Sequence, residues 1–267
     1  MIASRRDGRL VLVRQVDHQD QCGLMADVWG NEEFARPQPY APLALAARRH
    51  DEGWRRWEEH PRIDADGAPR GFTAMDLDEH VALYRRGIEA AVAADARAGL
   101  LVSLHGQGLY ERRRGLDPGP VTPRDERPPV LREYLDDQDA VQRAARASIG
   151  ADPALPRWEW AAYRLLQAWD VLSLYLTWTP LVEGRTMTLP RVPRAIGDAE
   201  GVDLVLAPGA GPGRATCAPW PFAAPSVDLP VRARAIEDRR YLSDDDLRSA
   251  LAAAPWTELG AVLSAGS

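Results

Sequence analysis

Residues 157–178 read RWEWAAYRLLQAWDVLSLYLTW, and their apolar side chains recur with helical spacing around much of the helix circumference. A surface helix has a single apolar stripe, whereas a helix that is apolar on most sides is normally buried. We therefore expect this segment to be a central helix on which other parts of the chain pack. Asp170 lies midway along it.

Five further helices are expected on the N-terminal side of this segment, from apolar spacing and from Pro and Gly near their ends. They cover residues 16–29, 43–57, 97–110 and 130–149, together with a helix that Asp76 or Asp78 caps and that ends near Ala94. The Asp7-Gly8 pair between two short apolar runs predicts a hairpin over residues 1–14. Residues 1–180 are therefore expected to form a helical domain with a short N-terminal hairpin.

The composition of the chain changes after Pro180, where Pro and Gly become frequent. Short alternating runs at residues 186–189, 202–206, 215–218 and 227–236 predict strands of an antiparallel sheet, and residues 244–254 predict a helix. We therefore expect a mainly α fold, with a helical bundle over residues 1–180 and a β-rich appendage over residues 181–267 packed on it.

The charge composition narrows the possible partners. The 267 residues include 33 basic and 39 acidic side chains, a formal charge of −6, and the chain contains no Lys. Such a mildly acidic chain makes nucleic-acid binding through a basic surface unexpected. No apolar run reaches the roughly 18 residues of a membrane span, and the run at residues 10–13 is too short for a signal peptide. The sequence predicts a cytoplasmic protein that binds neither nucleic acid nor a membrane.

Histidine is scarce, and its placement is informative. Four of the five histidines and two aspartates fall on successive expected helices, in the order His18, His50-Asp51, His80, His105 and Asp170. Imidazole nitrogen and carboxylate oxygen suit divalent Fe, Mn, Zn, Ni or Co, whereas the lack of clustered Cys argues against a thiolate zinc site. One catalytic ion keeps positions open for water and substrate, so these residues suit two ions roughly 3.5–4 Å apart better than one.

The ordered series His, His-Asp, His, His, Asp resembles the HD-domain superfamily, which comprises metal-dependent phosphohydrolases and a branch of mixed-valent di-iron oxygenases. The resemblance covers residues 15–180. The surrounding stretches, WGN at 29–31, HDEGW at 50–54, LVSLHGQGLY at 101–110 and QAWDVLSLYL at 167–176, also look like an uncharacterised bacterial family with HD-like features. The resemblance implies an HD-like arrangement of the helical bundle.

The resemblance also implies a role for each of these residues. One metal ion would be held by His18, His50, Asp51 and Asp170. A second ion would be held by His80 and His105, and Asp51 would bridge the two ions, which makes it the expected catalytic residue. Fe or Mn is expected first, and Ni, Co or Zn also fits these donors.

The sequence departs from the superfamily after the His-Asp doublet. Many HD proteins have a Lys two or three positions later that meets the substrate anion, whereas this chain reads HDEGW and has no Lys. Arg55, Arg56 or an Arg from the run at 111–114 could supply the positive charge instead, although such a run is more often a solvated surface. The candidate substrate contacts are Trp54, Gln107 and Tyr110, of which the two aromatic residues also fit as core side chains.

Two divalent ions would outweigh the carboxylates of Asp51 and Asp170, so a small anionic substrate is expected. The first hypothesis is hydrolysis of a phosphate ester or similar anion by a metal-bridging water. The second is cleavage of a C–C or C–P type bond with dioxygen at a di-iron pair, and the third is a non-catalytic metal-binding protein. The donor set fits all three hypotheses.

Overall fold

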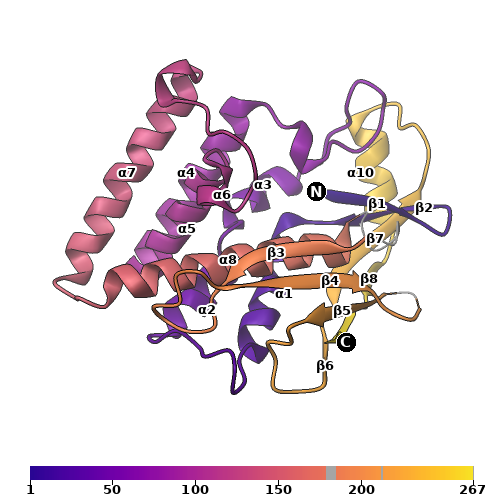
Figure 1. The fold of residues 1–267 in the computed structure, drawn as a ribbon. Coiled ribbons are helices and arrows are strands. Elements are labelled where there is room, and N and C mark those ends of the chain that lie inside the picture. The colour runs from indigo at the N-terminus through magenta and orange to yellow at the C-terminus, as the bar shows by residue number, and fades with distance from the viewer. Residues whose placement is uncertain (179–184, 212, 267) are drawn as a thin grey trace.

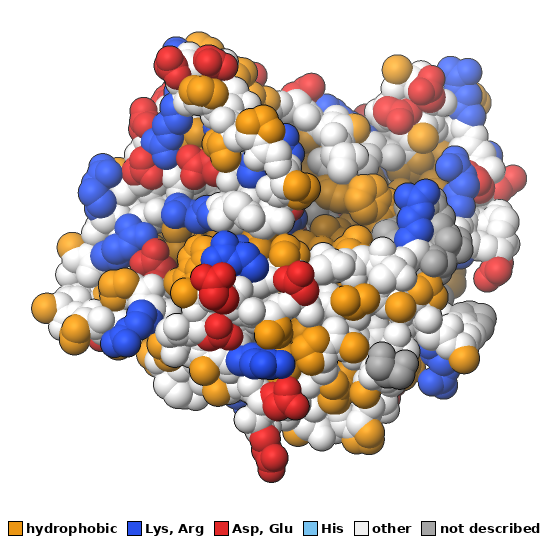
Figure 2. All heavy atoms as spheres, viewed as in Figure 1, with side chains coloured by type: hydrophobic (Ala, Val, Ile, Leu, Met, Phe, Trp, Pro, Cys, Tyr) orange, Lys and Arg blue, Asp and Glu red, His pale blue; other side chains and the backbone are white. Residues whose placement is uncertain are grey.

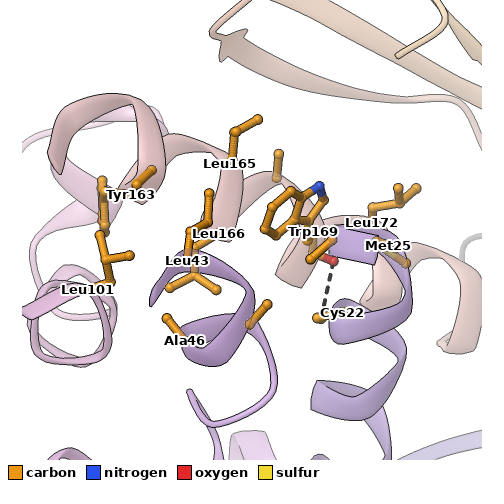
Figure 3. Packing of buried hydrophobic residues seen from close by; sticks show 14 of the residues in the cluster. Cys22, Met25, Leu43, Ala46, Leu101, Tyr163, Leu165, Leu166, Trp169 and Leu172 are labelled. Atoms are coloured by element: carbon orange, nitrogen blue, oxygen red, sulfur yellow. Dashed lines mark hydrogen bonds between the residues drawn. The ribbon is translucent and has the colours of Figure 1, made fainter. Parts of the chain in front are cut away.

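The computed structural model describes residues 1–178, 185–211 and 213–266, and α8 (Leu155–Thr177) runs through its middle (Figure 1). Three helices pack against α8, namely α1 (Gln15–Val28), α2 (Ala41–Ala47) and α5 (Ala96–Gly108). Figure 3 shows the side chains at this junction, with Trp169, Leu166 and Leu43 among those labelled. Every residue from 161 to 170 is buried. The expectation of a central buried helix is confirmed.

The remaining helical elements lie mostly on one side of α8. The two long ones are α4 (Leu77–Ala94) and α7 (Pro129–Ile149), and both pack against α5. The short ones are η1 (Glu52–Trp54), α3 (Arg55–Glu58), η2 (Phe72–Ala74), α6 (Arg112–Gly115) and η3 (Arg124–Glu126). The helices expected at residues 16–29, 97–110 and 130–149, and the one ending near Ala94, are confirmed to within about two residues.

The expected single helix over residues 43–57 is wrong, because α2 ends at Ala47 and the chain turns before η1. In a continued helix the carbonyl of Ala47 would accept from the backbone N–H of Asp51. Instead, Nδ1 of His50 hydrogen-bonds that carbonyl at 3.0 Å, and the Asp51 N–H donates to Oε1 of Gln19 at 2.9 Å. The His50-Asp51 doublet therefore lies in a turn and not on a helix.

Two sheets make up the β part of the molecule. The first has the order β1-β2-β7-β8 and consists of β1 (Ile2–Arg6), β2 (Arg9–Val13), β7 (Val231–Glu237) and β8 (Trp256–Leu259). The second has the order β3-β4-β5-β9-β6 and consists of β3 (Met187–Val192), β4 (Val202–Pro208), β5 (Arg214–Ala218), β9 (Val262–Ala265) and β6 (Ser226–Asp228). All pairs are antiparallel except β5 with β9. The last helix, α10 (Asp244–Ala253), packs on β7.

The expectation of a mainly α fold is wrong, because helices make up 47% of the chain and strands 20%, in two extended sheets. The strands are not confined to a C-terminal appendage either. The predicted N-terminal hairpin is confirmed, and its strand β2 pairs with β7, with Arg9 opposite Glu237 and Leu12 opposite Arg234. The alternation of a strand shows which face is buried but not which strand is its partner. The division into residues 1–180 and 181–267 stays a prediction, and the first sheet spans it.

The helices and the surface bear on the expected absence of membrane and nucleic-acid partners. None of the helices in residues 1–178, 185–211 and 213–266 combines the length and the hydrophobicity that a membrane span needs. On the face shown in Figure 2, Arg side chains are interspersed with Asp and Glu, so this face has no extended basic patch.

Candidate metal centre

His18 of α1 and Asp170 of α8 face each other where the two helices pack. Nε2 of His18 lies 3.0 Å from Oδ1 of Asp170, and both side chains are buried. Burial raises the pKa of Asp170, but the guanidinium of Arg113 and the hydrogen bond with His18 outweigh burial and hold that pKa well below its usual range. Asp170 is therefore a carboxylate at neutral pH.

A chain of hydrogen bonds sets the position of the His18 proton. The carbonyl of Leu229 can only accept, so the amide nitrogen of Gln21 donates to it at 2.6 Å. The amide oxygen of Gln21 accepts from the hydroxyl of Ser173 at 2.6 Å, and this hydroxyl accepts from Nδ1 of His18 at 2.6 Å. Nδ1 therefore carries a proton, and Nε2 points at the carboxylate of Asp170. Two electron-rich atoms 3.0 Å apart require a proton or a metal ion between them.

His50 repeats this arrangement from the turn after α2. Its Nδ1 donates to the carbonyl of Ala47, so Nε2 is the ring nitrogen left to bind a metal ion. Nε2 lies 3.7 Å from Oδ2 of Asp51 and 3.8 Å from Oδ1 of Asp170, and it is buried without a hydrogen-bond partner among the described residues. Buried polar atoms without partners are rare in folded proteins. A buried imidazole nitrogen without a partner between two carboxylates is an arrangement that a metal ion would complete.

His105 of α5 is the third histidine of this group, and its ring centroid lies 4.9 Å from that of His50. Burial lowers the pKa of His105 well below its usual value, so the ring is in the neutral form that binds metal ions. Oε1 of Gln167 accepts from Arg113 at 2.8 Å, so Nε2 of Gln167 donates to Nδ1 of His105 at 2.8 Å. The His105 proton therefore lies on Nε2, and metal binding through Nε2 requires the Gln167 amide to turn over and release Arg113.

The distances between these donor atoms agree with a metal site. Two ligands about 2.1 Å from one ion can be at most about 4.2 Å apart. The pairs His18–Asp170, His50–Asp51 and His50–Asp170 are separated by 3.0, 3.7 and 3.8 Å. Donor atoms of His50, Asp51 and His105 lie within 4.8 Å of one another, as do those of His18, Cys22 and His50. These buried His, Asp and Cys groups could hold a metal ion.

Cys22 was not among the residues expected here, although it lies one helical turn after His18 and so on the same face of α1. Its thiol donates to the carbonyl of Trp169, as Figure 3 shows, and burial raises its pKa well above the usual value. The i, i+4 spacing of the two residues was the available signal in the sequence.

The structure does not bring His80 into the group formed by His50, Asp51 and His105. Nδ1 of His80 hydrogen-bonds the hydroxyl of Tyr110, and its ring lies 5.0 Å from that of Tyr84. The Tyr84 ring is also 6.1 Å from that of His105, and its hydroxyl donates to Oδ1 of Asp51 at 2.9 Å. Tyr84 therefore lies between His80 and the group formed by His50, Asp51 and His105.

A cavity of about 340 Å³ lies beside the candidate donors, and it is lined by Asp51, His80, His105 and Asp170 together with Trp54, Tyr110 and Arg113. Trp54 and Tyr110 are thus at the cavity, as expected for substrate contacts. Gln107 is not, because its amide hydrogen-bonds Asp139 and Gln142 of α7. Two helical positions after His105 lie about 200° around the axis, so the two side chains point to opposite sides of α5.

Arg113 is the cation that reaches this cavity. Its NH1 donates to Oδ2 of Asp170 at 2.6 Å, and its side chain is 13% exposed. The backbone of Arg112, Arg113 and Arg114 is left-handed, with φ of 52°, 47° and 53°, which is costly for residues with a Cβ. Of the other candidates, Arg55 pairs with Glu52 and Arg56 is exposed. The run of arginines therefore turns inward at Arg113, although such runs more often form a solvated surface.

We expect Ser173→Ala to lower the affinity for divalent metal by about 10- to 100-fold, because the substitution removes the acceptor that orients His18. Competition with a chelating dye measures this affinity. Ser148→Ala, at a surface position of α7, is the control and should bind metal as the wild type does. Unchanged affinity in Ser173→Ala would show that the ring of His18 needs no such support.

Comparison with known proteins shows the family to which the chain belongs. No curated protein and no solved structure matches the chain significantly. The model of the family described as "Protein of unknown function (DUF3891)" matches residues 1–238, a range that includes every residue of the centre. The chain therefore belongs to this DUF3891 family.

Proposed function

We propose that this protein is a metal-dependent hydrolase, with the chemistry of the HD-domain superfamily, that acts on a phosphate ester or similar small anion. The observation that carries the proposal is that Nε2 of His18 and Nε2 of His50 both face buried carboxylates. Hydrogen bonds at both Nδ1 atoms direct these nitrogens at the carboxylates, which is how metal-binding imidazoles are held in place. Imidazole and carboxylate donors favour Fe or Mn and also fit Ni, Co or Zn.

Two ions are proposed, with Asp51 shared between them. The two oxygens of Asp51 face different groups, since Oδ2 lies 3.7 Å from Nε2 of His50 and Oδ1 accepts from Tyr84. A carboxylate with this orientation can offer one oxygen to each of two ions. His80 and His105 would be donors to the second ion, and both line the same cavity.

Divalent ions at this centre would lower the pKa of water, so that hydroxide is available at neutral pH, and would stabilise charge developing on a phosphoryl oxygen. Divalent metal would balance the charge of Asp170, and the guanidinium of Arg113, which lines the cavity, would then be available to the anionic group of the substrate. Burial raises the pKa of Tyr84 well above its usual value, so its hydroxyl keeps its proton and holds Asp51 in place. Trp54 and Tyr110 form an aromatic wall that excludes water.

The cavity volume limits the substrate class. About 340 Å³ is at the small end of the range for ligand pockets, so it suits a compact anion and not a polymer. The half-buried and buried apolar side chains in the wall, Phe72, Leu109 and Leu174 among them, favour a substrate with an apolar portion beside its anionic group.

Metal analysis followed by two activity assays tests the proposal. The purified full chain is analysed by plasma mass spectrometry, stripped, and reloaded with Mn, Fe, Co, Ni or Zn. Hydrolysis of bis(p-nitrophenyl) phosphate and oxygen uptake are then measured for each form. We expect about two ions per chain and phosphodiester hydrolysis with at least one of these metals. His60→Gln, which changes an exposed loop residue, is the control and should retain both properties.

The outcomes separate the three hypotheses. Two irons with a mixed-valent paramagnetic signal and substrate-dependent oxygen uptake would replace hydrolysis by oxygenation. Metal binding without turnover of any phosphoester would leave a metal-binding protein. Absence of metal binding at millimolar concentration would overturn the proposal.

A further inference from the structure

Arg164 of α8 is a buried charge that the metal centre does not use. It is 2% exposed, and its Nε, NH1 and NH2 have no hydrogen-bond partner in the part of the chain that the structure describes. Its Cζ lies 4.4 Å over the ring of Trp160, and Arg191 stacks on the same ring at 5.7 Å. Burial lowers the pKa of Arg164 to about 10, and the charge of Arg191 adds to this effect, so Arg164 is still protonated at neutral pH.

Arg164 lines a second cavity, of about 380 Å³, between α8, the segment 113–118 and β3. Arg113 and Asp117 also line it, but the charge of Arg113 is already balanced by Asp170 at 2.6 Å and Asp117 at 3.6 Å. Arg164 therefore lies buried in the cavity wall without a carboxylate of its own. A buried cation is stable only when an opposite charge or several hydrogen bonds compensate its loss of hydration.

We propose that this second cavity binds a small oxyanion, a phosphate or a carboxylate group, held by the guanidinium of Arg164. A guanidinium offers two parallel N–H groups that match the oxygens of such an anion. Gln167 and Thr188 line the same cavity and supply further polar groups. The bound anion neutralises Arg164.

This oxyanion site adjoins the metal centre. Arg113 lines both cavities, and Gln167, in the wall of the second, donates to His105 of the first. The site itself does not depend on the proposed hydrolase activity, because among the described residues no hydrogen bond joins the Arg164 side chain to a candidate metal ligand.

Thermal unfolding of the full chain at constant ionic strength tests the proposal, with sodium phosphate or sodium acetate replacing sodium chloride. For a site with millimolar Kd, 10 mM phosphate should raise Tm by about 3–6 °C. Arg164→Met should show no such shift, and in chloride it should melt at or above the wild type because it lacks an unpaired buried charge. The larger response, to phosphate or to acetate, identifies the anion. The shift should persist after chelation, which separates this site from the metal centre.

Two further variants keep the test decisive. Arg157→Met, at an exposed position of the same helix, should respond to phosphate as the wild type does. Arg164→Lys keeps the charge but not the planar fork, so calorimetric titration should give phosphate affinity at least about 10-fold weaker than wild type. A wild-type response in Arg164→Met or equal affinity in Arg164→Lys would overturn the proposal, as would the absence of any shift in the wild type.

Discussion

Asp51→Asn is expected to lose at least about 90% of the bound divalent metal while the protein stays folded. The substitution removes one negative charge and replaces a carboxylate oxygen, 3.7 Å from Nε2 of His50, by a group that binds metal poorly. The amide oxygen can still accept from Tyr84, so the packing of this residue against α4 is retained. Plasma mass spectrometry after dialysis measures the metal, and circular dichroism checks the fold.

The pattern of loss among related variants tests the bridging role. Asp170→Asn should lose chiefly the ion held with His18, because the donors of the second ion remain. His60→Gln should keep the full metal content. Near-stoichiometric metal in Asp51→Asn would disprove the bridging role.

Arg113→Gln is expected to lower kcat/KM for a phosphodiester by about 10- to 100-fold without loss of metal, a fall that corresponds to one charge-assisted hydrogen bond to the substrate. Metal affinity should stay the same or rise, because Arg113 occupies Asp170 and Gln167 in the structure. Without this competing cation, the carboxylate of Asp170 is free to bind metal. The Gln167 amide can also turn over, so that its oxygen accepts from Nδ1 of His105 and Nε2 of His105 is left to bind metal. Steady-state kinetics and chelator competition measure the two effects separately.

The control for this experiment is the neighbouring residue. Arg112→Gln changes an exposed side chain in the same left-handed run, so it tests whether the turn alone matters. It should leave kcat/KM within about twofold of wild type. If Arg113→Gln instead loses metal to the level of Asp51→Asn, Arg113 supports the carboxylate of Asp170 and does not bind substrate.

Local sequence patterns were enough to predict most of the long helices. The central helix α8 and the long helices α4, α5 and α7 follow from a 3.6-residue period and from end signals a few residues away. The selection of candidate donors also needed only residue type and order along the chain. The structure brings His18, His50 and Asp51 together with Asp170 and places His105 beside them, and metal binding by this group stays a prediction.

Other features depended on contacts between residues far apart in the sequence. The break after Ala47 follows from the bond between Asp51 and Gln19, which no local period reports. In the same way, β2 pairs with β7, which lies more than 200 residues later in the sequence. The relay from Leu229 through Gln21 and Ser173 to His18 joins three segments.

The placement of charge in the interior shows the physical reason for this difference. Periodicity reports which side of an element is buried, because burial of apolar surface needs no particular partner. A buried charge is stable only where another element supplies its counter-charge or hydrogen bonds, as Asp170 does for Arg113. The sequence could therefore identify the helices and the candidate donors, whereas the docking of those helices determined that Arg113 reaches the site, that Gln107 does not, and that Arg164 lies unpaired in a cavity wall.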